Sequence, residues 1–292
     1  DYQTPRDIEN FKFPKLLNKN FFIADFFDLD HAFNDVFRKS SFSFIIGNPP
    51  WKRGSGKNKE KNLFELYIKN RKTIEKSNTP ISISNKEIAQ AFIFRASDFS
   101  HNLTRIVFIV TSKTLYNLNA RTFRRYLLEN YFIDRVFDLS PVRKEVFDKS
   151  NDPSVAPAAV VFYRYAYNTD TSNNIVEHYS IKPNRFFSLF KVFLIQRNDV
   201  KTFRQEFLIK HEWLWKALLY GNFHDYYFIR RLKENYKTIG QVTNEKGSHV
   251  GQGVMIGGGD SNDASHLVGQ KYISTTHDVE PFCISTCPPY LP

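Results

Sequence analysis

Four consecutive residues, Asn48-Pro49-Pro50-Trp51, combine side chains that could do chemistry. Two prolines in a row lack backbone N–H donors and fix φ at about −65°. The residue before each proline is held in an extended conformation. The sequence therefore predicts a stiff turn that offers acceptors, including the Pro49 carbonyl and the side-chain oxygen of Asn48. Trp51 adds a flat apolar face on which a nucleobase can stack, an interaction of ~1–3 kcal/mol.

Such a corner suits the exocyclic amine of a nucleobase. The lone pair of this amine is delocalised into the ring, so the nitrogen is a poor nucleophile. If Asn48 Oδ1 and the Pro49 carbonyl each accept one of its hydrogens, the nitrogen can become tetrahedral and expose its lone pair. The base must first leave the duplex, which costs a few kcal/mol and is comparable to stacking on Trp51. The alternative is a rigid surface turn with no chemical role.

Two predicted strands position this corner. Residues 21–24 are apolar and are followed by Asp25, whereas residues 41–47 (SFSFIIG) read as a second strand and are followed by Asn48. Residues 31–39 between them have helical spacing of apolar side chains. Because ligands bind outside the carboxyl ends of parallel strands, we expect Asp25 and Asn48 to lie on the same edge of one sheet.

The rest of the chain continues this alternation. Helices are predicted near residues 63–74, 84–100 and 119–130, and strands at residues 105–111, 132–139 and 158–165. The pattern predicts a mostly parallel α/β sheet with helices on both faces. It changes at the polar stretch 168–174, so we expect one domain over residues 1–167, linker helices over 168–240 and a further mixed α/β segment over 241–292.

Residues 46–51 (IGNPPW) strongly resemble the catalytic motif of amino-methylating DNA methyltransferases that use S-adenosylmethionine. Ala24-Asp25-Phe26 resembles the motif of this family that binds the cofactor adenine. The resemblance implies an incomplete Rossmann-like methyltransferase sheet, with Asp25 accepting from the adenine amino group and Phe26 packed near its ring. An Asp25 that only caps a turn is the alternative. The order and spacing of the motifs are typical of adenine-N6 enzymes whose recognition domain follows the catalytic one, as in type IIG and type I-like restriction–modification proteins.

The resemblance extends to about Tyr165. It implies that residues 158–165 line the target-base pocket, with Phe162 or Tyr163 as a second aromatic side chain, although plain core packing is equally open. The glycine-rich cofactor loop of the family does not appear in the 24 residues before Asp25, and the glycine cluster at residues 251–259 lacks the required spacing. We therefore expect a piece that begins partway through the catalytic domain and binds S-adenosylmethionine weakly or not at all.

Charge points to an anionic partner, either nucleic acid or an acidic membrane surface. The chain has 41 Lys and Arg against 30 Asp and Glu, a net charge of +11, and its pI is about 9.4. We expect double-stranded DNA, with its phosphates contacted by the basic side chains that follow the motif, although a solvated loop is the alternative. These side chains are Lys52, Arg53, Lys57, Lys59 and Lys61.

Composition narrows the class of protein further. No apolar run approaches the ~20 residues of a membrane-spanning helix, and the content of hydrophobic residues, 41%, is too high for a disordered chain. A single disulfide between Cys283 and Cys287 could not stabilise a chain of this size, which fits a reducing cytoplasm. Residues 211–231 look like the linker into a target recognition domain, and residues 247–259 and 271–273 look like its beginning.

The leading hypothesis is therefore methyl transfer to the N6 amine of a flipped adenine in DNA, within a restriction–modification or related defence system. No metal is required, because the leaving group is a neutral thioether. Methylation of a cytosine N4 amine, an RNA guanine amine or a protein glutamine is one alternative, and a non-catalytic DNA-binding module is another. The parent protein could also carry a fused nuclease or restriction subunit.

Overall fold

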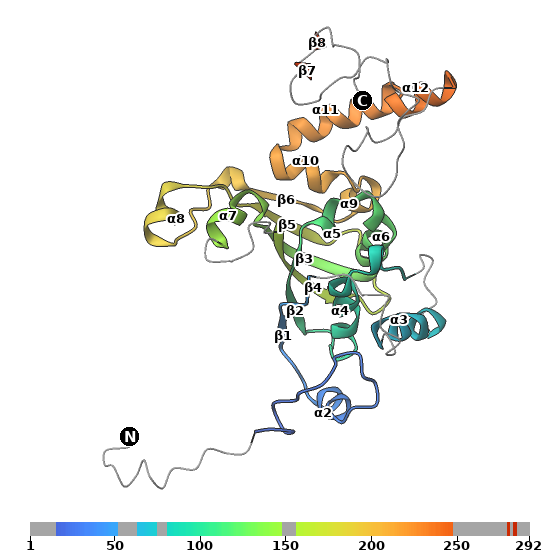
Figure 1. The fold of residues 1–292 in the computed structure, drawn as a ribbon, viewed down its shortest axis with the longest axis vertical. Coiled ribbons are helices and arrows are strands. Elements are labelled where there is room, and N and C mark those ends of the chain that lie inside the picture. Colours follow the sequence, from blue (N-terminus) through green and yellow to red (C-terminus); the bar gives the residue numbers. More distant parts are fainter. Residues whose placement is uncertain are drawn as a thin grey trace, which may run out of the picture. The chain divides into compact units, whose positions relative to one another are not determined.

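The structure is a computed structural model that describes residues 16–51, 63–74, 81–147, 156–247, 279–280 and 283–284 (Figure 1). The chain divides into two compact units, Asp1–Glu234 and Asn235–Pro292. In the second unit, α12 (Ile239–Glu245) is described together with β7 (Val279–Glu280), which pairs antiparallel with β8 (Cys283–Ile284). None of the helices in the described ranges is long and apolar enough to cross a lipid bilayer.

The first unit is built on a six-stranded sheet with the order β1-β2-β4-β3-β5-β6. Its strands are β1 (Phe44–Gly47), β2 (Arg105–Thr111), β3 (Tyr131–Asp138), β4 (Ala158–Tyr165), β5 (Ile175–Ser180) and β6 (Val200–Arg204). The predicted α/β fold class is confirmed, but the sheet is mixed rather than mostly parallel. The pairs β1–β2 and β3–β5 are parallel, whereas β2–β4, β3–β4 and β5–β6 are antiparallel.

Antiparallel neighbours need no crossover helix, and the connections between those that follow each other in the chain carry short helices. The connection from β3 to β4 contains the four-residue α7 (Arg143–Val146), and the one from β5 to β6 contains the six-residue α8 (Arg185–Phe190). The polar stretch 168–174 joins β4 to β5 within the same sheet, so the region predicted as linker helices contains two strands of it.

The longer helices agree with the sequence pattern. The helices of the first unit are α2 (Phe33–Lys39), α3 (Leu63–Ile74), α4 (Ile88–Ser97), α5 (Lys113–Tyr116), α6 (Arg121–Asn130), α7, α8, α9 (Glu206–Lys210), α10 (Leu214–Tyr220) and α11 (Phe223–Asn235). The strand predicted at residues 21–24 is not formed, and an isolated bridge between Leu17 and Phe21 is the pairing described there. An apolar run becomes a strand only where a neighbouring strand pairs with it.

The core lies on one face of the sheet. Along β2 the side chains of Ile106, Phe108 and Val110 are buried, whereas Val107 and Ile109 are half-buried. The buried face packs on α4 and α6, which Figure 1 shows on the same side of the sheet. Fully burying one such side chain contributes ~1.5–3 kcal/mol, so this face fixes the register of the strands.

A histidine in this core has an unusual environment. His178 of β5 is fully buried, and neither of its ring nitrogens has a hydrogen-bond partner among the described residues. Its ring packs 5.7 Å from that of Trp215. Burial, helped by the charge of Lys201, lowers the pKa of His178 to about 3. The imidazole is therefore neutral in the folded protein at neutral pH.

Replacing His178 by phenylalanine is expected to remove a pH dependence of stability. The unfolded chain binds a proton below about pH 6.5, whereas folded His178 does not until about pH 3, so protonation favours unfolding as the pH falls through this window. The wild type should lose about 2 kcal/mol through this group between about pH 7 and about pH 5. Urea unfolding at both pH values measures the effect. His224→Phe, at an exposed position of α11, is the control. If wild type and His178→Phe lose the same free energy of unfolding between the two pH values, the buried imidazole is not the cause of the pH dependence.

Candidate active site

The predicted corner follows the carboxyl end of β1. Asn48 and Pro50 are exposed, Pro49 is buried and Trp51 is half-buried. Gly47 pairs with Phe108 of β2, and a Cβ at Gly47 would lie 2.9 Å from the Phe108 ring. A glycine therefore lets β1 approach β2 closely just before the turn, and the turn presents the amide of Asn48 to solvent.

Trp51 is held by two contacts. Its Nε1 donates to the carbonyl of Ile109 on β2 at 3.1 Å. The edge of its ring meets Phe147, with 5.9 Å between the ring centroids and an interplanar angle of 81°. Phe147 is also half-buried and follows α7 directly. The two rings therefore form an aromatic pair, and Trp51 follows Asn48 by three residues in the chain.

The carboxyl ends of four strands meet at one edge of the sheet, which we call the carboxyl edge. β1 is parallel to β2, and β3 is parallel to β5. Because β4 runs antiparallel to both β2 and β3, the strands β1, β2, β3 and β5 all run in the same direction. The turns that leave this edge begin at Asn48, Ser112, Leu139 and Ile181. Ligands bind at such an edge in open α/β sheets.

A buried carboxylate joins two of these turns. Asp138, at the end of β3, accepts from the Ser140 backbone N–H at 2.9 Å, the Tyr116 hydroxyl at 3.0 Å and the Ser112 hydroxyl at 3.3 Å. The Ser140 hydroxyl also donates to the Ser112 hydroxyl at 2.8 Å. Burial raises the pKa of Asp138 and that of Tyr116. We call these four residues the Asp138 network; it ties the turn after β2 to the turn that leads into α7.

The predicted cofactor residues lie on a segment that is not a strand. Asp25 is exposed, and its Oδ1 accepts from the Phe27 N–H at 2.8 Å, which is a local turn contact. The half-buried ring of Phe26 stacks on Phe92 of α4, with centroids 5.0 Å apart and planes at 16°. The expectation that both Asp25 and Asn48 end strands of one sheet is therefore not met, because only Asn48 does.

Arg95 of α4 holds this segment, and the sequence pattern did not identify it. Its guanidinium is fully buried, donates to the Phe26 carbonyl at 3.0 Å and to Asp98 at 2.8 Å, and bonds the side-chain oxygen of Asn34. It also lies over the ring of Phe99, 4.6 Å from its centroid. An arginine within an apolar helical stretch was the available signal, because a buried arginine requires several partners.

The two weaker aromatic candidates lie in the middle of β4. Phe162 and Tyr163 pair with Val107 and Ile106, four and five residues before the end of β2 at Thr111. Tyr163 is buried, its hydroxyl donates to the Ile93 carbonyl at 3.1 Å, and burial raises its pKa well above the usual value. The half-buried ring of Phe162 lies 5.8 Å from that of Phe137. The structure brings Phe147 to the motif instead of these two rings.

The predicted phosphate contacts at Lys52, Arg53, Lys57, Lys59 and Lys61 lie outside the described residues. The carboxyl edge nevertheless carries other exposed cations, namely Lys113 on α5 and Arg143 and Lys144 on α7. Within the part of the chain that the structure describes, no three His, Cys, Asp or Glu side chains group closely enough to hold a metal ion.

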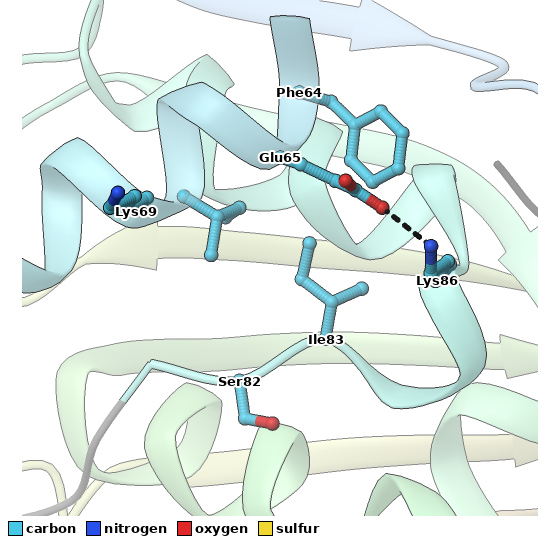
Figure 2. Close-up of a pocket in the computed structure, with 7 residues that line it drawn as sticks. Phe64, Glu65, Lys69, Ser82, Ile83 and Lys86 are labelled. Atoms are coloured by element: carbon cyan, nitrogen blue, oxygen red, sulfur yellow. Dashed lines mark ion pairs between the residues drawn. The ribbon is translucent and has the colours of Figure 1, made fainter. Parts of the chain in front are cut away.

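A hollow of about 270 Å³ lies elsewhere, between α3 and the turn that precedes α4 (Figure 2). It shares no residue with the motif. Glu65 and Lys86 form an ion pair of 3.0 Å within its lining, as Figure 2 shows. The other lining residues are Phe64, Ile68, Lys69, Ser82 and Ile83.

Residues 3–147, about half of the chain, match the family described as "Eco57I restriction-modification methylase". A comparison with curated proteins gave no match. The structure resembles the type IIG restriction endonuclease BpuSI, with 17% identity over 76% of this chain and 23% of that chain and a TM-score of 0.43. It also resembles the methyltransferase subunit of a type I restriction-modification system from Streptococcus thermophilus, with 14% identity over 65% of this chain and 39% of that chain and a TM-score of 0.42.

The type IIL restriction-modification enzyme MmeI, solved in complex with DNA, is a third similar structure, with 15% identity over 57% of this chain and a TM-score of 0.34. The chain spans only 20% of the length of MmeI and 25% of a type I restriction-modification structure that it also matches.

Proposed function

Since residues 3–147 belong to the restriction-modification methylase family, we propose that this chain is part of an enzyme that methylates the N6 amine of a flipped adenine in double-stranded DNA. One observation carries the proposal. The turn at Asn48 leaves the carboxyl edge with its amide exposed, beside a half-buried tryptophan that is fixed by Ile109 and Phe147. An acceptor next to a flat apolar wall is what a flipped base with an amino group requires.

Each residue of the corner has a defined part in this reaction. Asn48 Oδ1 and the Pro49 carbonyl accept the two amine hydrogens, which frees the nitrogen lone pair to attack. Trp51 and Phe147 provide the apolar surfaces that hold the base outside the duplex. S-adenosylmethionine supplies the methyl group when it is bound. Because the residues mainly orient the reactants, positioning accounts for most of the rate enhancement.

The exposed carboxylate of Asp25 fits one end of the cofactor. An exposed carboxylate can accept from the amino group of adenine, and in this chain one Asp25 oxygen is already held by the Phe27 N–H. Phe26 offers an aromatic ring that Arg95 and Phe92 keep in place. We propose that these two residues contact the adenine of S-adenosylmethionine in the complete protein.

Phe147→Ala is expected to slow methyl transfer about tenfold, because the base loses one stacking partner worth ~1–3 kcal/mol. Phe147→Tyr should keep most of the activity, because the ring remains. The rates are measured in the complete protein with a duplex substrate. Phe42→Ala is the matched control, since Phe42 is half-buried against Phe37 and precedes the opposite end of β1. Equal rates for Phe147→Ala and wild type would show that Phe147 does not contact the flipped base.

The direct test identifies the methylated base. The complete protein is incubated with duplex DNA and methyl-labelled S-adenosylmethionine, and the DNA is digested to nucleosides. Label in N6-methyl-2′-deoxyadenosine is expected. Label in N4-methyl-2′-deoxycytidine would keep the mechanism and change the base. Label that appears only in RNA or protein offered in a parallel reaction would overturn the choice of DNA.

A non-catalytic DNA-binding module is the second candidate. One observation favours it: the segment before Asp25 does not form the predicted strand, so the described residues build only part of a cofactor site. Calorimetry with S-adenosylmethionine separates the two candidates. Heat of binding in the complete protein, reduced by Asp25→Ala, supports the enzyme, and no binding there supports the module.

A further inference from the structure

The connection from β5 to β6, residues 181–199, leaves the carboxyl edge and contains α8; we call it the α8 arm. It begins directly after Ser180 of β5, whose direction matches that of β1. Figure 1 shows α8 projecting from the body of the sheet. The arm and the Asn48 turn therefore emerge at the same edge of the same unit.

The tip of the arm exposes large apolar side chains. Phe186, Leu189 and Phe190 are 55%, 74% and 66% exposed. The rings of Phe186 and Phe190 lie next to each other, with centroids 6.3 Å apart and planes at 30°. Three further apolar side chains of the arm are also exposed, namely Val192, Leu194 and Ile195. Several large apolar side chains exposed on one short arm are typical of a binding surface.

Local contacts keep this tip in shape although it is exposed. Asn184 caps α8 by accepting from the Phe187 N–H at 2.9 Å. The buried ring of Phe187 stacks on Phe193, with centroids 4.5 Å apart and planes at 17°. One side of α8 thus anchors the arm, and the other side presents Phe186 and Phe190 to solvent.

The charged side chains of the arm identify the kind of partner. Its cations, Lys182, Arg185, Lys191 and Arg197, are all exposed. The single acid among residues 181–199, Asp199, is buried and paired with Lys182 at 3.4 Å. Together with the exposed cations of α5 and α7, the arm extends a positive surface along the carboxyl edge, so an anionic partner fits it.

The spacing of the strands fits duplex DNA. Four strand intervals separate β1 from β5 in the order β1-β2-β4-β3-β5. At ~4.8 Å each they span ~19 Å. A duplex rises ~3.4 Å for each base pair, so this span corresponds to roughly 5–6 base pairs. A duplex lying along the carboxyl edge with one base in the Asn48 corner would therefore pass the arm.

We propose that the α8 arm binds duplex DNA, with Phe186 and Phe190 wedged against the bases in the minor groove roughly 5–6 base pairs from the flipped base and with the cations of the arm on the phosphates. The inference rests on the proposed function for the position of the flipped base. Apolar side chains flanked by cations also suit an anionic lipid surface. The carboxyl edge that the arm shares with Asn48 favours DNA, and a lipid surface is an outcome of the test.

The first experiment measures affinity. The full chain and its Phe186→Ser/Phe190→Ser variant are titrated at low salt with a fluorescent duplex of about 20 base pairs, roughly two helical turns. The variant should bind about tenfold more weakly. Leu103→Ser is the matched control, because Leu103 is 88% exposed and lies before the opposite end of β2. Equal binding by wild type and double variant overturns the inference.

The second experiment reports on the tip itself. In Phe190→Trp, stacking on bases should quench the added tryptophan emission when the duplex is present, relative to wild type. Vesicles of phosphatidylcholine and phosphatidylglycerol are the second arm of the test. If the tryptophan emission of Phe190→Trp changes with these vesicles but not with DNA, the choice of DNA as the partner is overturned.

The two proposals fail in different ways. If the wild-type chain does not bind duplex DNA, the inference and the proposed DNA substrate fail together. If the wild type binds DNA and the complete protein methylates adenine, but neither Phe186→Ser/Phe190→Ser nor Phe190→Trp responds, only the role of the α8 arm fails.

Discussion

Asn48→Ala is expected to lower the rate of methyl transfer by at least about 100-fold, which is the loss that follows removal of one preorganised hydrogen-bond partner in an active site. The reason is that the amine of the base keeps its lone pair delocalised when only the Pro49 carbonyl accepts from it. The affinity for DNA should change by no more than a few-fold, because the predicted phosphate contacts belong to other residues and supply most of the affinity. Single-turnover rates and DNA binding, both in the complete protein, measure the two quantities separately.

Two further variants make this prediction specific. Asn48→Asp keeps an acceptor oxygen at the same position and should retain more activity than Asn48→Ala. Asn119→Ala should behave as wild type, since Asn119 is exposed in the turn between α5 and α6. Near wild-type turnover by Asn48→Ala would refute the role of the amide, and weak DNA binding by it would indicate a misfolded corner rather than lost chemistry.

Arg95→Ala is expected to reduce the free energy of unfolding by about 3 kcal/mol, within the range for removing one member of a buried ion pair. The substitution leaves the Phe26 carbonyl, the side chain of Asn34 and one oxygen of Asp98 without their donor. Asp98 keeps its contact with Arg71 at 2.8 Å, which limits the loss. Urea unfolding followed by circular dichroism measures the effect.

The control for this prediction is another arginine ion pair. Arg125 pairs with Glu129 at 2.9 Å, but its side chain is 66% exposed, so Arg125→Ala should cost no more than about 0.5 kcal/mol. Arg95→Met keeps the apolar stem of the side chain, so its loss in the free energy of unfolding should lie between those of Arg95→Ala and Arg125→Ala. A loss of less than about 0.5 kcal/mol for Arg95→Ala would show that Arg95 does not hold the segment around Phe26.

Much of the sheet could be predicted because its strands are buried apolar runs. The strands at residues 105–111 and 158–165 have the predicted bounds, and α3 begins and ends where the apolar spacing placed it. Strand β1 is shorter than predicted, Phe44–Gly47, but it ends at the predicted residue, so the position of Asn48 was correct. The fold class and the turn that carries the motif were thus available from local patterns.

The remaining features depend on contacts distant in the sequence. The apolar residues 21–24 predicted a strand, but no neighbouring strand pairs with them in the described part of the chain. The antiparallel placement of β4 between β2 and β3 is a choice of partner that periodicity does not encode. Phe147 lies 96 residues after Trp51, and only the fold shows that their rings meet.

The contact between Trp51 and Phe147 also shows which parts of the chain set the relative position of the two rings. The tryptophan is supplied by the turn after β1 and the phenylalanine by the segment after β3, and β2 and β4 lie between these strands. At ~4.8 Å for each interval, β1 and β3 lie ~14 Å apart. The rings therefore meet only because both loops reach inward. The relative position of the two rings therefore depends on the length of both loops, which can change without altering β1.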